Sequence, residues 1–166
     1  KINKGNIEFK NVSFAYPKTT DAAIKDINFY ANGGSTTALV GHSGAGKSTI
    51  INLIPRFYVP GDGIINIDEQ NINDVKLSSL RKNISLVSQD IILFDDTVRA
   101  NIAYAKLEAS DKEIKKACDF AAATEFIEKL PKSYETIIGE NGIKLSGGQK
   151  QRISIARAIL KDSPII

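Results

Sequence analysis

The residues with the clearest chemical potential form a glycine-rich run that ends in a lysine and two hydroxyl residues. It reads Gly41-His42-Ser43-Gly44-Ala45-Gly46-Lys47-Ser48-Thr49, in which Gly41, Gly46, Lys47 and Ser48 fit the spacing GxxxxGKS/T. Glycines let the backbone curl so that successive N–H groups point inward toward an anion. Lys47 would place a positive charge against terminal phosphates, and the Ser48 hydroxyl would hold Mg²⁺. The run therefore predicts a binding loop for a polyphosphate.

Two neighbouring segments would hold this loop in place. The apolar run Ala38-Leu39-Val40 precedes it, and the run from Ile50 to Ile54 follows it with helical character. The pattern is strand, loop and helix, with the strand expected over residues 36–40. The positive end of the helix would add to the attraction for phosphate.

The rest of the first half is rich in strand patterns. In the first expected strand, apolar residues alternate with a period of two at Ile7 and Phe9 and again at Val12, Phe14 and Tyr16. The alternation slips by one residue at Lys10-Asn11, which predicts a β-bulge. Further strands are expected over residues 27–30, 63–67 and 84–87, with one or two helical turns over 75–82.

The second half has helical periodicity. Ser110 and Glu113 have the spacing of a capping box, and an apolar face follows at Ile114, Ala117, Cys118, Ala121 and Ala122. Another helix is expected from Gln151 to Leu160. We therefore expect one domain in two parts, a β-rich part over about 1–88 with the phosphate loop and a helical part over about 89–160.

Composition limits the possible functions. The 166 residues are 42% hydrophobic, and the net charge of +3 comes from 22 basic and 19 acidic residues that are well mixed. Mixed charge gives no basis for a nucleic-acid partner, and no apolar run approaches the ~18 residues that span a bilayer. The one cysteine, Cys118, lies on an apolar helix face, which favours a buried side chain over a nucleophile.

A second glycine pair that opens a helix lies in Leu145-Ser146-Gly147-Gly148-Gln149. By itself this sequence could be only a helix cap with Ser146 as the capping residue. Together with the phosphate loop it resembles the nucleotide-binding domain of ATP-binding cassette (ABC) transporters. The resemblance implies an α/β P-loop NTPase fold, with an antiparallel β subdomain and a helical subdomain that carries LSGGQ.

In that family the two motifs belong to one composite site. The resemblance implies a head-to-tail dimer of two copies, in which Ser146, Gly147, Gly148 and Gln149 of one copy complete the ATP site of the other. ATP and Mg²⁺ are the implied ligands. ATP would be bound by Tyr16, Gly41, Ser43, Gly44, Ala45, Gly46, Lys47, Ser48 and Thr49. Tyr16 matches the aromatic residue that stacks on adenine in the family. Gln89 matches the glutamine that contacts Mg²⁺ together with Ser48 and lies near the attacking water. Lys47 and Gln89 are therefore the expected catalytic residues.

Two stretches are similar to the exporter branch, in particular to the bacterial lipid A exporter (flippase) family. The stretch from Gln89 to Asp96 and the loop from Gly139 to Gly142 would contact the transmembrane domain of the same exporter. The implied activity is ATP hydrolysis coupled to export of a lipid or amphipathic substrate, at the cytoplasmic face of the bacterial inner membrane. At the turn after Asp68, Glu69 stands where the family usually has glycine.

The family mechanism also needs a Walker B strand that ends in Asp-Glu and, further on, a switch histidine. Residues 64–69 superficially resemble a Walker B strand because they end in Asp-Glu, but Asn66 interrupts the aliphatic run, so we reject this assignment. His42 lies at a variable position of the phosphate loop and cannot serve as the switch histidine. We therefore expect a fold truncated before the Walker B strand. A nucleotide-binding module without turnover and a soluble ABC ATPase remain as alternatives, and P-loop kinases give no reason for LSGGQ.

Overall fold

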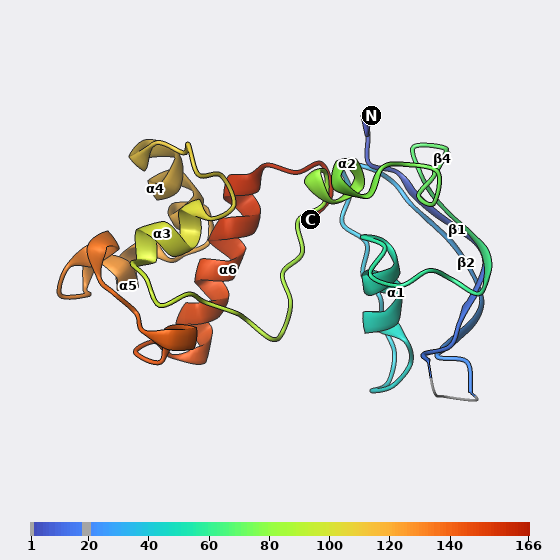
Figure 1. Ribbon diagram of the computed structural model, residues 1–166, viewed down its shortest axis with the longest axis horizontal. Coiled ribbons are helices and arrows are strands. Elements are labelled where there is room, and N and C mark those ends of the chain that lie inside the picture. Colours follow the sequence, from blue (N-terminus) through green and yellow to red (C-terminus); the bar gives the residue numbers. More distant parts are fainter. Residues whose placement is uncertain (1, 18–20) are drawn as a thin grey trace. The chain divides into compact units, whose positions relative to one another are not determined.

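The chain divides into two compact units (Figure 1). The computed structural model describes residues 2–17 and 21–166. The first unit contains the residues up to Ile84 together with Ile165, and the second contains Ser85–Pro164 and Ile166. The sequence pattern places the boundary near Gln89, whereas the contacts place it directly after Ile84. Each unit is described by itself below.

The first unit contains a 4-stranded antiparallel sheet. Its strands are β1 (Ile7–Phe14), β2 (Ile24–Ala31), β3 (Asp62–Ile67) and β4 (Gln70–Asn71), in the order β2-β1-β3-β4. The register of β1 shifts between Phe9 and Val12, and Asn11 has φ 50°. The predicted β-bulge is therefore confirmed.

Two short helices, α1 (Lys47–Leu53) and α2 (Leu77–Lys82), complete the first unit. The predicted turns over residues 75–82 are confirmed as α2. Leu53, Ile65 and Ile72 are almost fully buried, and Ile84 belongs to the same core. Burial of one face of the sheet against these helices gives the unit a hydrophobic core of its own.

Two predicted strands are absent, and those predictions were wrong. Residues 36–40 have no strand pairing, and the Val40 side chain is 93% exposed. Ile84 makes a single parallel bridge to Ile165, while Leu86 is 39% exposed. A strand needs a hydrogen-bonded neighbour along its length, and neither segment has one within the described part of the chain. Apolar runs alone do not supply that neighbour.

The second unit is helical. It contains α3 (Val98–Ala103), α4 (Asp111–Phe120), α5 (Thr124–Glu128) and α6 (Gly147–Lys161), with 3₁₀ turns η1 (Ser133–Glu135) and η2 (Glu140–Gly142). The predicted helix from Gln151 to Leu160 lies within α6. Helices α3 and α4 both pack on α6 (Figure 1). Val98, Ile102, Ile127 and Ile153 are fully buried in the core that these helices share.

The capping box of α4 is confirmed. The Glu113 carboxylate accepts from the Ser110 N–H at 2.8 Å, and Ser110 Oγ accepts from the Glu113 N–H. Cys118 is fully buried, and burial raises the pKa of its thiol to about 11. The prediction that Ala122 belongs to the apolar face was wrong. The helix ends before Ala122, which is exposed and has φ 51°. Among the described residues, no helix is both long and apolar enough to cross a bilayer.

Candidate nucleotide-binding site

The phosphate loop leads directly into α1 of the first unit. Gly46 is the N-terminal cap residue of this helix and has a left-handed backbone with φ 79°. A Cβ atom on Gly46 would lie 2.4 Å from Ile24 Cγ2 and 2.8 Å from the Ala23 carbonyl oxygen. Both the backbone conformation and this close approach to the start of β2 therefore require glycine. The predicted role of Gly46 in shaping the loop has a clear structural basis.

The Lys47 ammonium lies inside the curve of the loop. It donates to the Gly41 carbonyl oxygen at 2.8 Å and to the His42 carbonyl oxygen at 2.7 Å. An ammonium has three donors, so these bonds can be exchanged for bonds to anionic oxygens without leaving Lys47 unpaired. The loop is also braced by the Ala45 N–H, which donates to the His42 carbonyl oxygen at 3.1 Å. The positive charge is thus held against the start of the loop.

The two hydroxyl residues after Lys47 point to different environments. Ser48 is exposed in the first turn of α1, which suits contact with a metal ion at the surface of the loop. Thr49 is buried, and its Oγ1 lies 3.0 Å from the Tyr16 hydroxyl. Ser48 therefore fits the predicted Mg²⁺ contact, whereas Thr49 faces the interior.

Tyr16 is fixed by aromatic neighbours as well as by Thr49. Its ring is nearly perpendicular to the rings of Phe14 and Tyr58, with centroids 5.0 and 5.1 Å away. Such edge contacts hold a ring in one orientation. The structure thus places a half-buried aromatic residue beside α1, the helix that follows the phosphate loop.

The LSGGQ motif opens α6 in the second unit. Ser146 and Gln149 form a reciprocal capping box: the Gln149 side-chain oxygen accepts from the Ser146 N–H at 2.9 Å, and Ser146 Oγ accepts from the Gln149 N–H at 3.3 Å. Gly147 and Gly148 lie between them on an exposed turn. Apart from its chain neighbours and the backbone of its own helix, a Cβ atom on either glycine would have no described atom within 4 Å. Packing against other described parts of the chain therefore does not explain the two glycines.

Gln89 also belongs to the second unit. It is exposed in an irregular segment, where the Ser88 hydroxyl donates to the Asp90 carbonyl oxygen at 2.6 Å. The predicted position at the end of a regular strand is not seen, because residues 85–88 form no strand. The phosphate loop lies in one unit, and Gln89 and Ser146–Gln149 lie in the other.

The two stretches expected to face a transmembrane domain contact each other. The Ile138 N–H donates to the Asp96 carbonyl oxygen at 3.1 Å, and Thr97 forms an antiparallel bridge with Ile137. A Cβ atom on Gly142 would lie 2.7 Å from Leu93 Cδ1. Residues 93–97 thus lie beside residues 137–142 in the second unit. Sequence reasoning did not foresee this contact.

Sequence reasoning also missed two polar residues in the second unit, Asn101 and Arg157. Asn101 is completely buried, and Arg157 is half-buried on the face of α6 that carries Ile153, Ala156 and Leu160. The available signal in the sequence was the charged residue Arg157 on an apolar helix face. The role of Arg157 depends on hydrogen-bond partners that are distant in the sequence.

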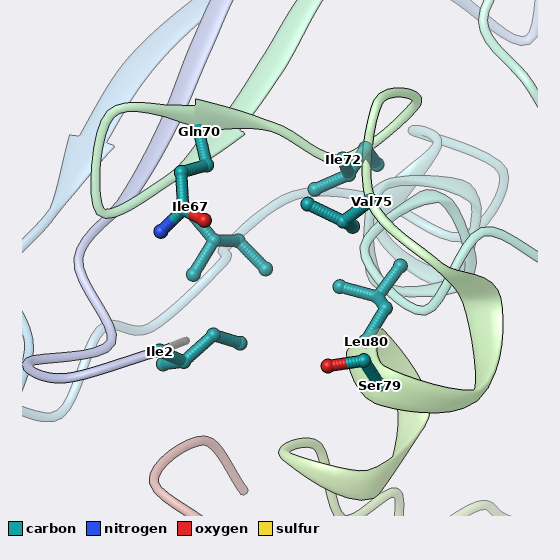
Figure 2. Close-up of a pocket in the computed structure, with 7 residues that line it drawn as sticks. All are labelled: Ile2, Ile67, Gln70, Ile72, Val75, Ser79 and Leu80. Atoms are coloured by element: carbon teal, nitrogen blue, oxygen red, sulfur yellow. The ribbon is translucent and has the colours of Figure 1, made fainter.

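The first unit also contains a small apolar hollow that is unrelated to the predicted site (Figure 2). Its lining combines Ile2, Ile67, Gln70, Ile72, Val75, Ser79 and Leu80 around a volume of about 20 Å³. That volume holds about one water molecule. The hollow is therefore an imperfection in the packing of β4 and α2 rather than a ligand site.

The fold and the two glycine motifs together are those of the ABC ATPase family. The family model described as "ABC transporter" matches residues 24–166. The chain belongs to the ABC transporter family.

Its relatives agree with this assignment. The chain is 53% identical over 163 residues to the "ATP-dependent lipid A-core flippase" of Legionella pneumophila (strain Paris). It is 54% identical over 164 residues to the protein of the same name from Haemophilus influenzae (strain ATCC 51907 / DSM 11121 / KW20 / Rd). A solved "bacterial Atm1-family ABC exporter with ATP bound" is 45% identical with a TM-score of 0.94. Each comparison covers 98% of this chain and 28% of the relative.

Proposed function

We propose that this chain is the ATP-binding part of an exporter that couples MgATP binding and hydrolysis to the movement of a lipid or amphipathic substrate across a bacterial inner membrane. The phosphate loop supports the nucleotide part of the proposal. That part is supported by the left-handed backbone of Gly46 and by the Lys47 ammonium, which the Gly41 and His42 carbonyl oxygens hold against the loop. The curated flippases support the lipid part, because their name states that substrate class.

The observation that carries the proposal is the exposed pair Gly147 and Gly148. Glycine in a helix costs roughly 0.5–1 kcal/mol relative to alanine, and among the described residues no packing contact from outside the local helix backbone requires it at these positions. The pair is explained if a second copy presents its nucleotide closely at the start of α6. Backbone N–H groups at a helix start can then meet phosphate oxygens.

In this proposal each predicted residue has a defined task. Bound MgATP supplies the phosphoryl bond whose hydrolysis releases free energy. Lys47 and the loop N–H groups hold the phosphates, Ser48 and Gln89 face the metal ion, and Tyr16 supports adenine. Rate would come from positioning and charge stabilisation rather than from covalent chemistry by the protein.

Isothermal titration of this chain with MgATP tests nucleotide binding. Lys47→Ala should weaken binding by about 10- to 100-fold, since charge-assisted hydrogen bonds contribute about 1.5–3 kcal/mol each. Lys112→Ala, an exposed lysine of α4, is the matched control and should bind normally. Equal affinity for Lys47→Ala and the control would reject the proposed loop.

Hydrolysis and coupling are tested in the full-length exporter. Phosphate release in phospholipid nanodiscs should increase when lipid A is added, and Lys47→Ala should abolish it. Phosphate release by this chain alone would reject the alternative of a binding module without turnover. Absence of lipid-stimulated hydrolysis in the wild-type exporter would contradict the proposed transport function.

A further inference from the structure

Arg157 of α6 connects three parts of the second unit through its guanidinium. Its Nε donates to the Asn101 carbonyl oxygen, one Nη donates to the Ile92 carbonyl oxygen at 2.7 Å, and the other Nη donates to Asn101 Oδ1 at 2.7 Å. Asn101 lies on α3, and Ile92 lies in the irregular segment that follows Gln89. One side chain thus joins α6, α3 and this segment.

Asn101 continues the connection to Phe94. Asn101 Oδ1 accepts from the Phe94 N–H at 2.9 Å, and Nδ2 donates to the carbonyl oxygens of Phe94 and Thr97, both at 3.0 Å. With the bond from Arg157, both donors and both acceptor positions of the buried amide are used. A fully satisfied amide of this kind fixes one arrangement of its partners.

Aromatic rings complete the environment of Arg157. The guanidinium carbon lies 5.5 Å from the Phe94 ring centroid and 6.0 Å from that of Tyr104, and the two rings are 4.8 Å apart. Burial lowers the pKa of the guanidinium. In the described part of the second unit, the salt bridges involve other residues and no carboxylate pairs with Arg157.

This arrangement is an unusual use of a charge. A half-buried arginine without a carboxylate loses solvation, so an apolar side chain of similar volume would serve packing at least as well. What arginine adds is a rigid fork of donors that reaches three oxygens in fixed directions. The gain is therefore in the placement of residues 92–94, which otherwise lack regular secondary structure.

We propose that Arg157 is a positioning residue that locks the segment after Gln89 to the helix that begins with LSGGQ, so that the two move as one body. The proposal rests on the proposed function, in which this segment faces the transmembrane domain and LSGGQ faces the nucleotide of a second copy. Displacement of residues 92–94 by substrate in the membrane would then reach Ser146–Gln149 through α6. Arg157 touches neither nucleotide nor substrate in this scheme.

Hydrogen exchange of the full-length protein tests the lock directly. In Arg157→Gln, the N–H groups of Phe94 and Asp96, which donate to Asn101 Oδ1 and to the Phe94 carbonyl oxygen, should exchange about tenfold faster, because local opening becomes easier. Arg157→Lys keeps the charge but loses the fork and should give an intermediate effect. Arg152→Gln is the matched control, since that exposed arginine of the same helix contacts the Ala122 carbonyl oxygen instead. Unchanged exchange at Phe94 and Asp96, or faster exchange throughout the second unit, would overturn the lock.

Hydrolysis measurements test the transmission. Arg157→Gln should keep the KM for ATP within about twofold while the stimulation by lipid A in nanodiscs falls toward onefold. A variant with the faster local exchange but full lipid stimulation would overturn the role in transmission. If the wild-type exporter shows no lipid stimulation, the proposed function has failed, and the exchange measurement still decides whether Arg157 holds the segment.

Discussion

Leu93 and Gly142 approach so closely that a single added carbon would not fit between them. Leu93 is buried, and a Cβ atom on Gly142 would lie 2.7 Å from its Cδ1. Gly142 also has φ 63°. The contact explains why the loop over 139–142 ends in glycine, and it joins this loop to the segment that contains Gln89.

Gly142→Ala should therefore destabilise the second unit by about 2–4 kcal/mol, from overpacking and left-handed backbone strain. Urea unfolding followed by circular dichroism measures this, since the chain has no tryptophan. The double variant with Leu93→Ala should lose less than the sum of the two single changes, because the clashing methyl group is gone. Strict additivity would contradict the contact.

Gly148→Ala should have opposite effects on stability and activity. Stability should rise by up to about 1 kcal/mol, since alanine is the better helix former and its Cβ would meet no described atom beyond the local helix backbone. If the proposed composite site exists, hydrolysis by the full-length protein should fall by more than about tenfold, because the added carbon would occupy the space of the second copy's nucleotide. Gln151→Ala, an exposed change on the same helix, should stabilise without loss of hydrolysis. Unaltered hydrolysis in Gly148→Ala would contradict the composite site.

Two glycines of the phosphate loop separate backbone strain from steric fit. Gly44 and Gly46 have φ 81° and 79°, but only Gly46 would press its Cβ against Ile24 and Ala23. Gly44→Ala should cost about 1–2 kcal/mol from strain alone, and Gly46→Ala roughly 1–3 kcal/mol more. Titration with MgATP should show a larger loss of affinity for Gly46→Ala than for Gly44→Ala. Equal effects of the two changes would mean that the approach to β2 is unimportant.

Asp68 should make the stability of the first unit depend on acid pH. Burial opposes ionisation, but N–H donors from Asn3, Lys4, Gly5 and Asn6 outweigh it and lower the pKa of Asp68 to about 2, from a usual 3.8. Its stabilisation is thus present above about pH 4 and is lost as the pH falls toward 2.

Asp68→Asn should reduce stability at neutral pH and flatten the decline between pH 4 and 2, as measured by thermal unfolding. Glu113 in the second unit retains a decline of its own, since its bonds to Lys106 and Ser110 also lower its pKa to about 2. Glu69→Gln removes a carboxylate from the same turn and should keep the full decline. A decline in Asp68→Asn as steep as in the wild type would contradict this role.

The turn between β3 and β4 offers a simple stabilising change. Asp68 and Glu69 both have positive φ, 47° and 65°, as a two-residue type I′ hairpin requires. Glu69→Gly should stabilise the unit by about 1 kcal/mol, because glycine adopts this backbone without strain. Glu69→Ala keeps the Cβ and is the control, with no expected gain. Equal stability of the glycine and alanine variants would count against backbone strain.

Local signals in the sequence predicted local structure well. The bulge near Asn11, the capping box of Ser110 and Glu113, and the Gly46 loop before α1 were all readable, because each depends on neighbouring residues. The predictions of strands over residues 36–40 and 84–87 were wrong, because strand pairing depends on segments that are distant in the sequence. The Arg157–Asn101 network and the contact of Leu93 with Gly142 join parts far apart in sequence, and a single sequence does not show which parts meet.

The burial of Cys118 also makes this chain convenient for spectroscopy. Its thiol is fully buried with a raised pKa, so little thiolate is available to react with maleimide or methanethiosulfonate reagents. It is also the sole cysteine of the chain. A cysteine introduced at an exposed position such as Leu107 can therefore carry a spin label or fluorophore without removal of the native thiol.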